Sequence, residues 1–259
     1  MSVKPKKHFG QHFLTDKNIA SKTADLIERF STKNILEIGP GMGMLTQFLL
    51  NKKDYHVKVV EIDPESVSYL QQNYQDLEVM SNDFLKMDLS DVFDRNEFAI
   101  IGNFPYNISS QILFKALEYR HLVPNVAGMF QLELAERVAS QPHSKSYGVI
   151  SVLFQAFYDI NIEFKISPSV FNPPPKVNSA VIFASRKAED DISCDHKLFT
   201  RIVKMSFNQR RKTLANSLKQ LNIPKEILNQ NQFAKLRPEN LSVSEFVQLT
   251  NDISSIIGQ

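Results

Sequence analysis

The sequence predicts an α/β fold, followed by a smaller region made only of helices. Short apolar and β-branched runs alternate with segments of helical periodicity between residues 34 and 184. These runs lead into a glycine-rich turn or into polar residues, which is typical of strands whose carboxyl ends meet a ligand. Beyond a charged stretch at residues 186–191, only helical periodicity remains. We therefore predict two domains, residues 1–187 and residues 188–259.

Composition is that of an ordinary globular protein. The chain has 259 residues, of which 42% are hydrophobic and 22% are charged, enough for a sizeable core. Its one cysteine, Cys194, excludes an intramolecular disulfide and a multi-cysteine zinc site, and it favours a reducing compartment. We find no signal peptide and no apolar run near the ~20 residues that a membrane span needs. The expectation is a cytoplasmic protein without a metal, and a monomer is the simplest state.

A lysine-rich segment precedes the first predicted helix. It contains Phe9 and Gly10, and Asp16 behind it has the position of a helix N-cap. Glycine and aromatic residues directly before a helix favour an ordered lid, although a frayed terminus is the usual state of such a segment. The helix after Asp16 has the apolar spacing of a core helix up to Phe30.

A glycine-rich turn follows the first predicted strand, Asn34 to Ile38. It reads Glu37-Ile-Gly-Pro-Gly-Met-Gly43 and leads into a helical stretch from Met44 to Leu50. Glycines let the backbone approach a ligand closely, and a strand before the turn with a helix behind it is the context that a nucleotide site requires. The next strand, His56 to Ile62, contains Glu61 at its end. An acidic side chain there can accept from both ribose hydroxyls of a nucleoside.

The spacing of this turn discriminates among cofactors. Met44 stands where a dinucleotide pattern has its third small residue, which counts against NAD, and no Gly-Lys-Ser/Thr phosphate loop is present. S-adenosylmethionine fits better, with its ribose at Glu61 and its methionine part along the glycines. The third strand, Leu77 to Ser81, leads to Asp83 and Phe84. Asp83 can accept from the adenine amine and Phe84 can flank the ring, although an isolated Asp-Phe is most often a turn.

The loop Gly102-Asn-Phe-Pro-Tyr106 follows a buried strand and has the chemistry of an adenine-amine site. The amine of adenine is a weak nucleophile because its lone pair is delocalised into the ring. An enzyme can accept from both amine protons, here with the Asn103 side-chain oxygen and the Phe104 carbonyl, which Pro105 confines to extended geometry. Tyr106 offers a face for a flipped base, an interaction worth about 1–3 kcal/mol. The alternative is a plain strand end and proline turn with a core aromatic residue.

The remaining elements continue the pattern. The further predicted strands are Phe98–Ile101, Val126–Phe130, Ile160–Ile166 and Ser179–Ala184. The further predicted helices are Ile112–Leu117, with Ser109 and Ser110 as N-cap, Glu133–Ala139, Lys197–Phe207, Thr213–Leu221, Pro224–Leu228 and Val243–Ile257. The stretch Val149–Phe157 is helical or buried. Three consecutive prolines, Pro173 to Pro175, make a stiff loop between the last two strands. Phe171 on that loop can close on the target base opposite Tyr106; the alternative is a rigid connection with Phe171 in the core.

Basic residues gather at two places, although the net charge of the chain is only +2. The groups are Lys4, Lys6, Lys7 and His8, and Arg201, Lys204, Arg210, Arg211 and Lys212. Each group alone is typical of a solvated face or tail, but two groups flanking a base-handling loop favour nucleic acid. The residues that we expect at phosphates are Lys6, Lys7, Arg210, Arg211 and Lys212.

Several stretches together identify a family. They are Phe9-Gly-Gln-His-Phe-Leu14, Glu37-Ile-Gly-Pro-Gly41, Gly102-Asn-Phe-Pro-Tyr-Asn-Ile-Ser109, Ser144-Lys-Ser-Tyr-Gly148, Ser167-Pro-Ser-Val-Phe-Asn-Pro-Pro-Pro-Lys-Val177 and Phe207-Asn-Gln-Arg-Arg-Lys-Thr213. With them the chain resembles the bacterial small-subunit rRNA adenine dimethyltransferases, known as KsgA or RsmA, over nearly its whole length. The Asn-Phe-Pro-Tyr loop alone would also fit DNA adenine methylases.

The resemblance implies a class I methyltransferase fold, Rossmann-like and seven-stranded, with a small helical C-terminal domain. It implies S-adenosylmethionine as methyl donor. The implied substrate is two adjacent adenosines in the 3′-terminal hairpin loop of small-subunit rRNA in the immature subunit, each methylated twice at N6. The family's cofactor contacts correspond to His12, Leu14, Gly39, Glu61, Asp83 and Asn103, to which the residue patterns add Gly41 and Phe84. The candidate catalytic residues are Asn103, Phe104, Pro105, Tyr106 and Phe171.

Two departures and two alternatives accompany the resemblance. His12 stands where the family usually has Asn, and Phe104 where many relatives have Leu. A large-subunit rRNA adenine methylase of the Erm type shares the fold and the catalytic loop, but Ser144 to Gly148 and Phe207 to Thr213 favour the small-subunit family. A non-catalytic ribosome-assembly factor is a different class of function, and the intact Glu61, Asp83 and Asn103 positions favour activity instead.

Overall fold

A computed structural model describes residues 3–6, 9–188 and 192–258 of the chain. It divides into two compact units, Met1–Ala135 with Asp159–Arg186 and Glu136–Tyr158 with Lys187–Gln259. The predicted domain ranges, 1–187 and 188–259, differ from this grouping in residues 136–158 and in Lys187.

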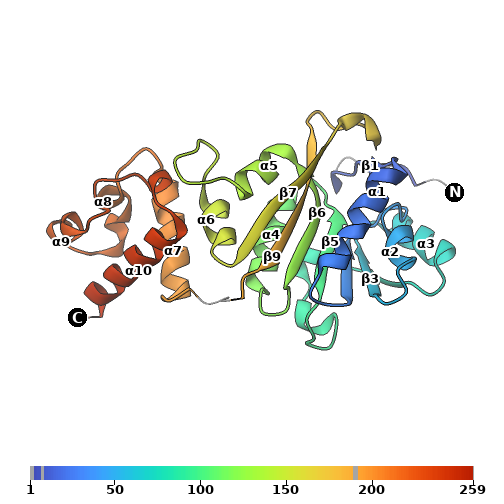
Figure 1. The fold of residues 1–259 in the computed structure, drawn as a ribbon, viewed down its shortest axis with the longest axis horizontal. Coiled ribbons are helices and arrows are strands. Elements are labelled where there is room, and N and C mark those ends of the chain that lie inside the picture. The colour runs from blue at the N-terminus through green and yellow to red at the C-terminus, as the bar shows by residue number, and fades with distance from the viewer. Residues whose placement is uncertain (1–2, 7–8, 189–191, 259) are drawn as a thin grey trace. The chain divides into compact units, whose positions relative to one another are not determined.

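A seven-stranded sheet with the order β4-β3-β2-β5-β6-β9-β7 forms the centre of the first unit (Figure 1). Its strands are β2 (Asn34–Ile38), β3 (His56–Glu61), β4 (Glu78–Ser81), β5 (Ala99–Asn103), β6 (Asn125–Gln131), β7 (Tyr158–Ile166) and β9 (Ser179–Arg186). Neighbours from β4 to β6 run parallel, and β9 lies antiparallel to β6. The predicted α/β fold and the predicted strands are confirmed. Parallel pairing brings the carboxyl ends of β2, β3, β4 and β5 to one edge, where α/β folds bind ligands.

Two of the four helices described in the first unit begin at an aspartate whose side chain caps them. The four helices are α1 (Lys17–Ala24), α2 (Thr46–Leu50), α3 (Pro64–Asn73) and α4 (Ser109–Glu118), with short 3-10 turns η2 (Asp25–Arg29), η3 (Phe84–Lys86), η4 (Leu89–Asp91) and η5 (Pro168–Val170). Asp16 caps α1 by accepting from the backbone N–H groups of Asn18 and Ile19, as predicted. The predicted cap of α4 was wrong: Ile108 has the cap position, and Ser109 is the first helical residue, with its Oγ donating to the Pro105 carbonyl.

A small second sheet joins the N-terminal segment to the proline-rich loop. Its strands, β1 (Phe13–Leu14) and β8 (Phe171–Asn172), pair antiparallel, with Leu14 opposite Phe171. Both of these side chains are buried in the apolar core of the unit. Two residues are too few to show strand periodicity, so this pairing was not predicted from the sequence. It fixes the segment before α1 to a loop about 160 residues further along the chain.

Helices make up the second unit in the residues that the structure describes. They are α6 (Val149–Gln155), α7 (His196–Asn208), α8 (Leu214–Ser217), α9 (Lys225–Gln230) and α10 (Val243–Ile257), with η6 (Leu218–Leu221) and η7 (Pro238–Asn240), while α5 (Leu132–Val138) crosses the boundary between the units. The stretch predicted as helical or buried is thus a helix, α6. It packs against α7 and α10, and this burial explains why residues 136–158 group with the C-terminal helices. Among the described residues, no helix has both the length and the apolar character needed to cross a membrane.

Candidate active site

Two cavities open at the carboxyl edge of the sheet, and both are lined by Phe13, Gly39 and Asn103. The first cavity has a volume of about 230 Å³ and the second about 290 Å³. Predicted site residues at the first cavity are His12, Gly39, Gly41, Glu61, Asp83, Asn103, Phe104, Pro105 and Tyr106. Leu14 lines the second cavity, together with Glu37 and Met44. The fold therefore gathers residues from four strand ends and from the N-terminal segment around one space.

The glycine-rich turn comes close to an aromatic ring and could not carry a side chain there. Gly41 has a φ of 57°, and a Cβ atom on it would lie 2.8 Å from the Phe13 ring. This is the left-handed region that favours glycine. The Gly41 N–H donates to the Glu61 Oε2 at 3.1 Å. The turn after β2 is thereby tied to the end of β3.

Glu61 is held in place by backbone donors. Its Oε1 accepts from the N–H groups of Ile62 at 2.8 Å and Asp63 at 2.9 Å, in addition to the bond from Gly41. Burial raises the pKa of this carboxyl, and the three N–H donors oppose that rise. A carboxylate has about four lone-pair sites, and the three N–H groups take three of them, so Oε2 keeps room for one ligand hydroxyl. The predicted ribose contact therefore has an oriented acceptor.

Glu37 is a functional candidate that the sequence reasoning missed. It lies in β2, is 1% exposed and lines the second cavity, and its Oε2 has no hydrogen-bond partner. Burial, assisted by the nearby charge of Glu61, raises the pKa of the Glu37 carboxyl to about 8. A buried carboxyl oxygen without a partner is costly unless a ligand supplies one. The available signal was a carboxylic acid between apolar residues in a strand buried on both faces.

The loop predicted to be catalytic starts at the last residue of β5. Asn103 donates from its Nδ2 to the His12 carbonyl at 2.9 Å, which orients the amide and leaves Oδ1 as an acceptor. The Phe104 side chain is buried and its ring packs on Phe130, with centroids 4.6 Å apart. Anchoring the side chain of Phe104 fixes the backbone that carries its carbonyl. The two acceptors predicted for an amine therefore sit on a rigid strand end.

Tyr106 has a different neighbour from the one predicted. Its hydroxyl hydrogen-bonds the Ser179 Oγ, and burial raises the pKa of the Tyr106 phenol. Its ring stacks on His12 with centroids 5.3 Å apart, and the His12 Nδ1 lies 2.7 Å from the Pro173 carbonyl oxygen. Phe171 is 4% exposed, belongs to the apolar core and does not line the first cavity. Pairing with β1 turns Phe171 inward in this structure, and the ring that stacks on Tyr106 is that of His12.

The loop after β4 also differs in one residue from the prediction. Asp83 lines the first cavity and accepts from the Leu85 N–H at 3.0 Å. Phe84 is buried away from the cavity, near the ammonium of Lys115, and Leu85 lines the cavity with Ile62. The 3-10 turn η3 causes this exchange because it points consecutive side chains in different directions.

The basic residues expected at phosphates have unequal surroundings. Lys6 forms ion pairs with Asp63 at 2.5 Å and Glu65 at 3.1 Å. Lys7 lies outside the described residues. In the second unit, Arg210 donates to the Ser144 carbonyl at 3.1 Å, while Arg211 and Lys212 are exposed. Of the described candidates, these last two are exposed, whereas Lys6 and Arg210 are half-buried.

The fold and the site together define a class I S-adenosylmethionine-dependent methyltransferase. The chain belongs to the ribosomal RNA adenine dimethylase family, whose model matches residues 2–259. It is therefore an enzyme that uses S-adenosylmethionine as methyl donor. The family expected from the sequence is thus confirmed.

Similar proteins agree with this assignment over most of the chain. The chain is 51% identical to a ribosomal RNA small subunit methyltransferase A of Bacteroides thetaiotaomicron, covering 98% of this chain and 96% of the relative. Among solved structures it resembles a dimethyladenosine transferase from Plasmodium falciparum, with a TM-score of 0.78 and 26% identity over 94% of this chain and 98% of that one. The 23S rRNA methyltransferase ErmE has a TM-score of 0.67 and 24% identity, covering 92% of this chain and 99% of that chain. That last similarity shows a shared fold only.

Proposed function

We propose that this chain transfers four methyl groups to N6 of two adjacent adenosines in the 3′-terminal hairpin loop of small-subunit rRNA, during small-subunit biogenesis. The oriented amide of Asn103, with its Oδ1 available at the junction of the two cavities, is the observation that carries the proposal. The name of the Bacteroides thetaiotaomicron relative supports the small subunit as target. The reaction places the protein in the cytoplasm with the ribosomes.

Residues at the cavities fit the parts of S-adenosylmethionine. Glu61 would accept from a ribose hydroxyl through Oε2, and Asp83 from the adenine amine. The unpartnered Oε2 of Glu37 would accept from the α-ammonium, which supplies the missing partner of a buried carboxyl. Leu85 and Ile62 give the first cavity the apolar walls that an adenine ring requires. When bound, the cofactor supplies an electrophilic methyl group on its sulfonium.

Methyl transfer needs an amine held in the right orientation. The Asn103 Oδ1 and the Phe104 carbonyl would accept from the amine protons of the target adenine, which gives its nitrogen tetrahedral character. Tyr106 would stack on the ring after the base leaves its stack, a step costing a few kcal/mol that is smaller in a loop than in a duplex. The chain supplies positioning and electrostatic stabilisation for direct in-line transfer, with the proton leaving to solvent.

Recognition of the RNA rests on its shape and phosphates. The exposed Arg211 and Lys212 lie after α7 in the second unit, beside Arg210. Positive side chains in this position are suited to phosphate contacts that weaken with added salt. We therefore propose that the helical C-terminal region contacts the rRNA. The protein would act on immature small subunits as a monomer.

The test is transfer of labelled methyl groups to purified, unmethylated small subunits, followed by mapping of the products. Label found as N6,N6-dimethyladenosine in the 3′-terminal hairpin supports the proposal. Label on large-subunit RNA would indicate an Erm-type methylase. Tight binding to immature subunits without any transfer would indicate an assembly factor without catalysis.

A further inference from the structure

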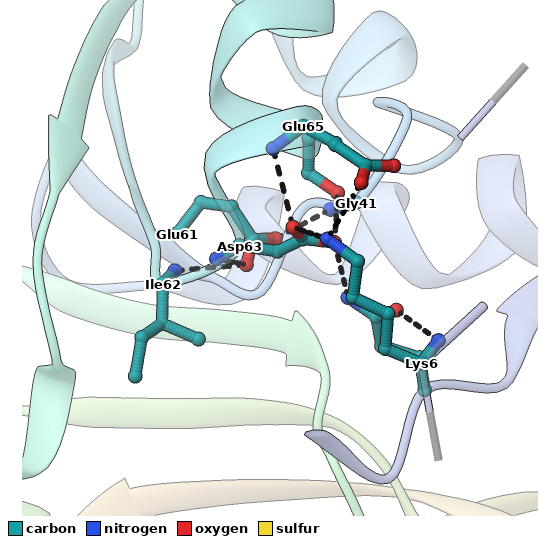
Figure 2. A network of polar contacts seen from close by, with 8 residues as sticks. Lys6, Gly41, Glu61, Ile62, Asp63 and Glu65 are labelled. Carbon is teal, nitrogen blue, oxygen red and sulfur yellow. Dashed lines mark hydrogen bonds and ion pairs between the residues drawn. The ribbon is translucent and has the colours of Figure 1, made fainter. Parts of the chain in front are cut away.

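A buried carboxylate at the start of α3 connects the N-terminal segment to the cofactor site. The Asp63 side chain is fully buried, with an exposed fraction of 0%. Figure 2 shows the Lys6 ammonium directed at this carboxylate, at 2.5 Å from Oδ1. Gln11 donates from its Nε2 to the Asp63 Oδ2 at 3.1 Å, and the Glu65 N–H caps Oδ1 at 3.2 Å. Lys6 and Gln11 thus both contact Asp63, which is more than 50 residues away from them in the sequence.

The same residue also orients the ribose acceptor. The Asp63 N–H donates to the Glu61 Oε1, while the Asp63 carboxylate accepts from the Lys6 ammonium (Figure 2). Burial raises the pKa of the Asp63 carboxyl, but hydrogen bonds from Lys6 and Gln11 outweigh this and lower it. The carboxylate is therefore charged, and its charge depends on the N-terminal segment for compensation.

The N-terminal segment forms one wall of the first cavity. Phe9, Gly10, Gln11, His12 and Phe13 all line it. We call residues 9–13 the strap. The Lys6 N–H donates to the Gln11 Oε1 at 2.8 Å, so the backbone of Lys6 is also bonded to the strap. Its far end is held by the pairing of β1 with β8.

Lys6 is therefore poorly placed for RNA. Three acidic residues, Glu61, Asp63 and Glu65, lie within five positions of one another, and Lys6 contacts two of them. A phosphate would have to replace a buried, charge-assisted bond, and removing one partner of such a pair leaves an uncompensated buried charge. The structure favours a role in the cofactor site over the phosphate contact predicted from the sequence.

We propose that Lys6 is a positioning residue whose ion pair with Asp63 fastens the strap across the first cavity and retards release of S-adenosylmethionine. The inference concerns cofactor retention and does not depend on which RNA is methylated. Its consequence is kinetic: with the ion pair broken, the strap opens more often and the cofactor leaves faster, while chemistry in the closed state is unchanged.

The test compares Lys6→Met with Lys4→Met in the full-length protein. Lys4 carries the same charge two positions away and is exposed, so it is a matched control. We expect Lys6→Met to raise the dissociation constant and dissociation rate of S-adenosylmethionine about tenfold, the size of a typical coupling between contacting residues. Lys4→Met should bind the cofactor as the unsubstituted protein does, and Lys6→Arg should recover most of the loss. The turnover number at saturating cofactor should change less than twofold, a split that a general folding defect would not give.

Asp63→Asn provides a second measurement on the same contact. If Lys6 acts through Asp63, the double variant Lys6→Met, Asp63→Asn should bind cofactor no more weakly than the weaker single variant. If Lys6→Met does not fold, Gln11→Leu tests the strap by removing its neutral contact, and it should also accelerate cofactor release. Unchanged cofactor release in the folded variants would overturn the proposal, and so would equal losses in Lys6→Met and Lys4→Met.

Discussion

The two walls of the first cavity are built from different kinds of bonds. One wall consists of strand ends, where Glu61 accepts from three backbone N–H groups and Asn103 ends a strand that pairs with both β2 and β6. The other wall is the strap, which is held by the side chains of Lys6 and Gln11 and by a two-residue ribbon. Backbone pairing within a sheet opens only at high free energy, whereas a segment with few such bonds opens locally. From this comparison we expect the sheet wall to carry the chemistry and the strap to control exchange of the cofactor.

The largest effect is expected at the sheet wall. Asn103→Ala removes the side-chain acceptor for the amine and the donor to the His12 carbonyl. We expect the single-turnover methylation rate to fall at least about 100-fold, the usual cost of losing one preorganised electrostatic contact. Circular dichroism and the thermal midpoint should remain close to those of the unsubstituted protein. Near-normal turnover by this variant would remove Asn103 from the mechanism.

A pH-dependent effect is expected at Glu37. Its pKa of about 8 in the folded protein exceeds that of an unfolded Glu, near 4.5, so the folded state retains a proton that the unfolded state has lost. The free energy of unfolding of the cofactor-free protein should therefore decrease as pH rises between these values, by up to about 1.4 kcal/mol per unit, and level off above about pH 8. Denaturant titrations of the unsubstituted protein and Glu37→Gln should diverge across this range.

The sign of the stability difference between the two proteins shows whether Glu37 binds the cofactor at a cost in stability or supports the fold. Glu37→Gln should be the more stable protein at pH 8 without cofactor, and it should bind S-adenosylmethionine more weakly. If the substitution destabilises the protein at every pH from 5 to 8, Glu37 serves the fold instead of the ligand.

Tyr106 should give an intermediate effect at the meeting point of the two walls. Tyr106→Ala removes the face on which the target base stacks, worth about 1–3 kcal/mol, so kcat/KM for RNA should fall between about 5-fold and 150-fold. Tyr106→Phe keeps the ring and loses only the bond to Ser179, and it should retain most of the activity. Equal losses in both variants would place the importance of Tyr106 in its hydroxyl.

The sequence allowed the residues of the first wall to be placed but not all contacts of the second, for a physical reason. Strand ends follow from local periodicity, so Glu61, Asp83 and Asn103 could be placed at one edge without coordinates. The orientation of Phe171 and the partner of Lys6 depend on contacts that span most of the chain or more than 50 residues. A short ribbon and one ion pair leave no periodic signal. The direction of the Phe84 side chain depends on a contact at closer range. Phe84 begins a 3-10 turn, and this turn determines which side chain faces the cavity.

The smallest effect is expected from His12, which joins the two walls. Its carbonyl accepts from Asn103, its ring stacks on Tyr106 and its Nδ1 contacts the Pro173 carbonyl. His12→Asn keeps the backbone acceptor and exchanges the stacked ring for a smaller amide. Since the contact to Asn103 is retained, we expect kcat to stay within about threefold, while KM for RNA changes by a few fold because the stacked ring accounts for only about 0.5–1.5 kcal/mol.

Glycine at position 12 provides the control for that interpretation. His12→Gly removes the side chain altogether but retains the carbonyl, so its KM should differ from that of the Asn variant only through the added freedom of the strap. A large loss of kcat in either variant would mean that the imidazole itself positions the reacting amine. In that case the strap would contribute to the chemistry, and the division of labour between the two walls would not hold.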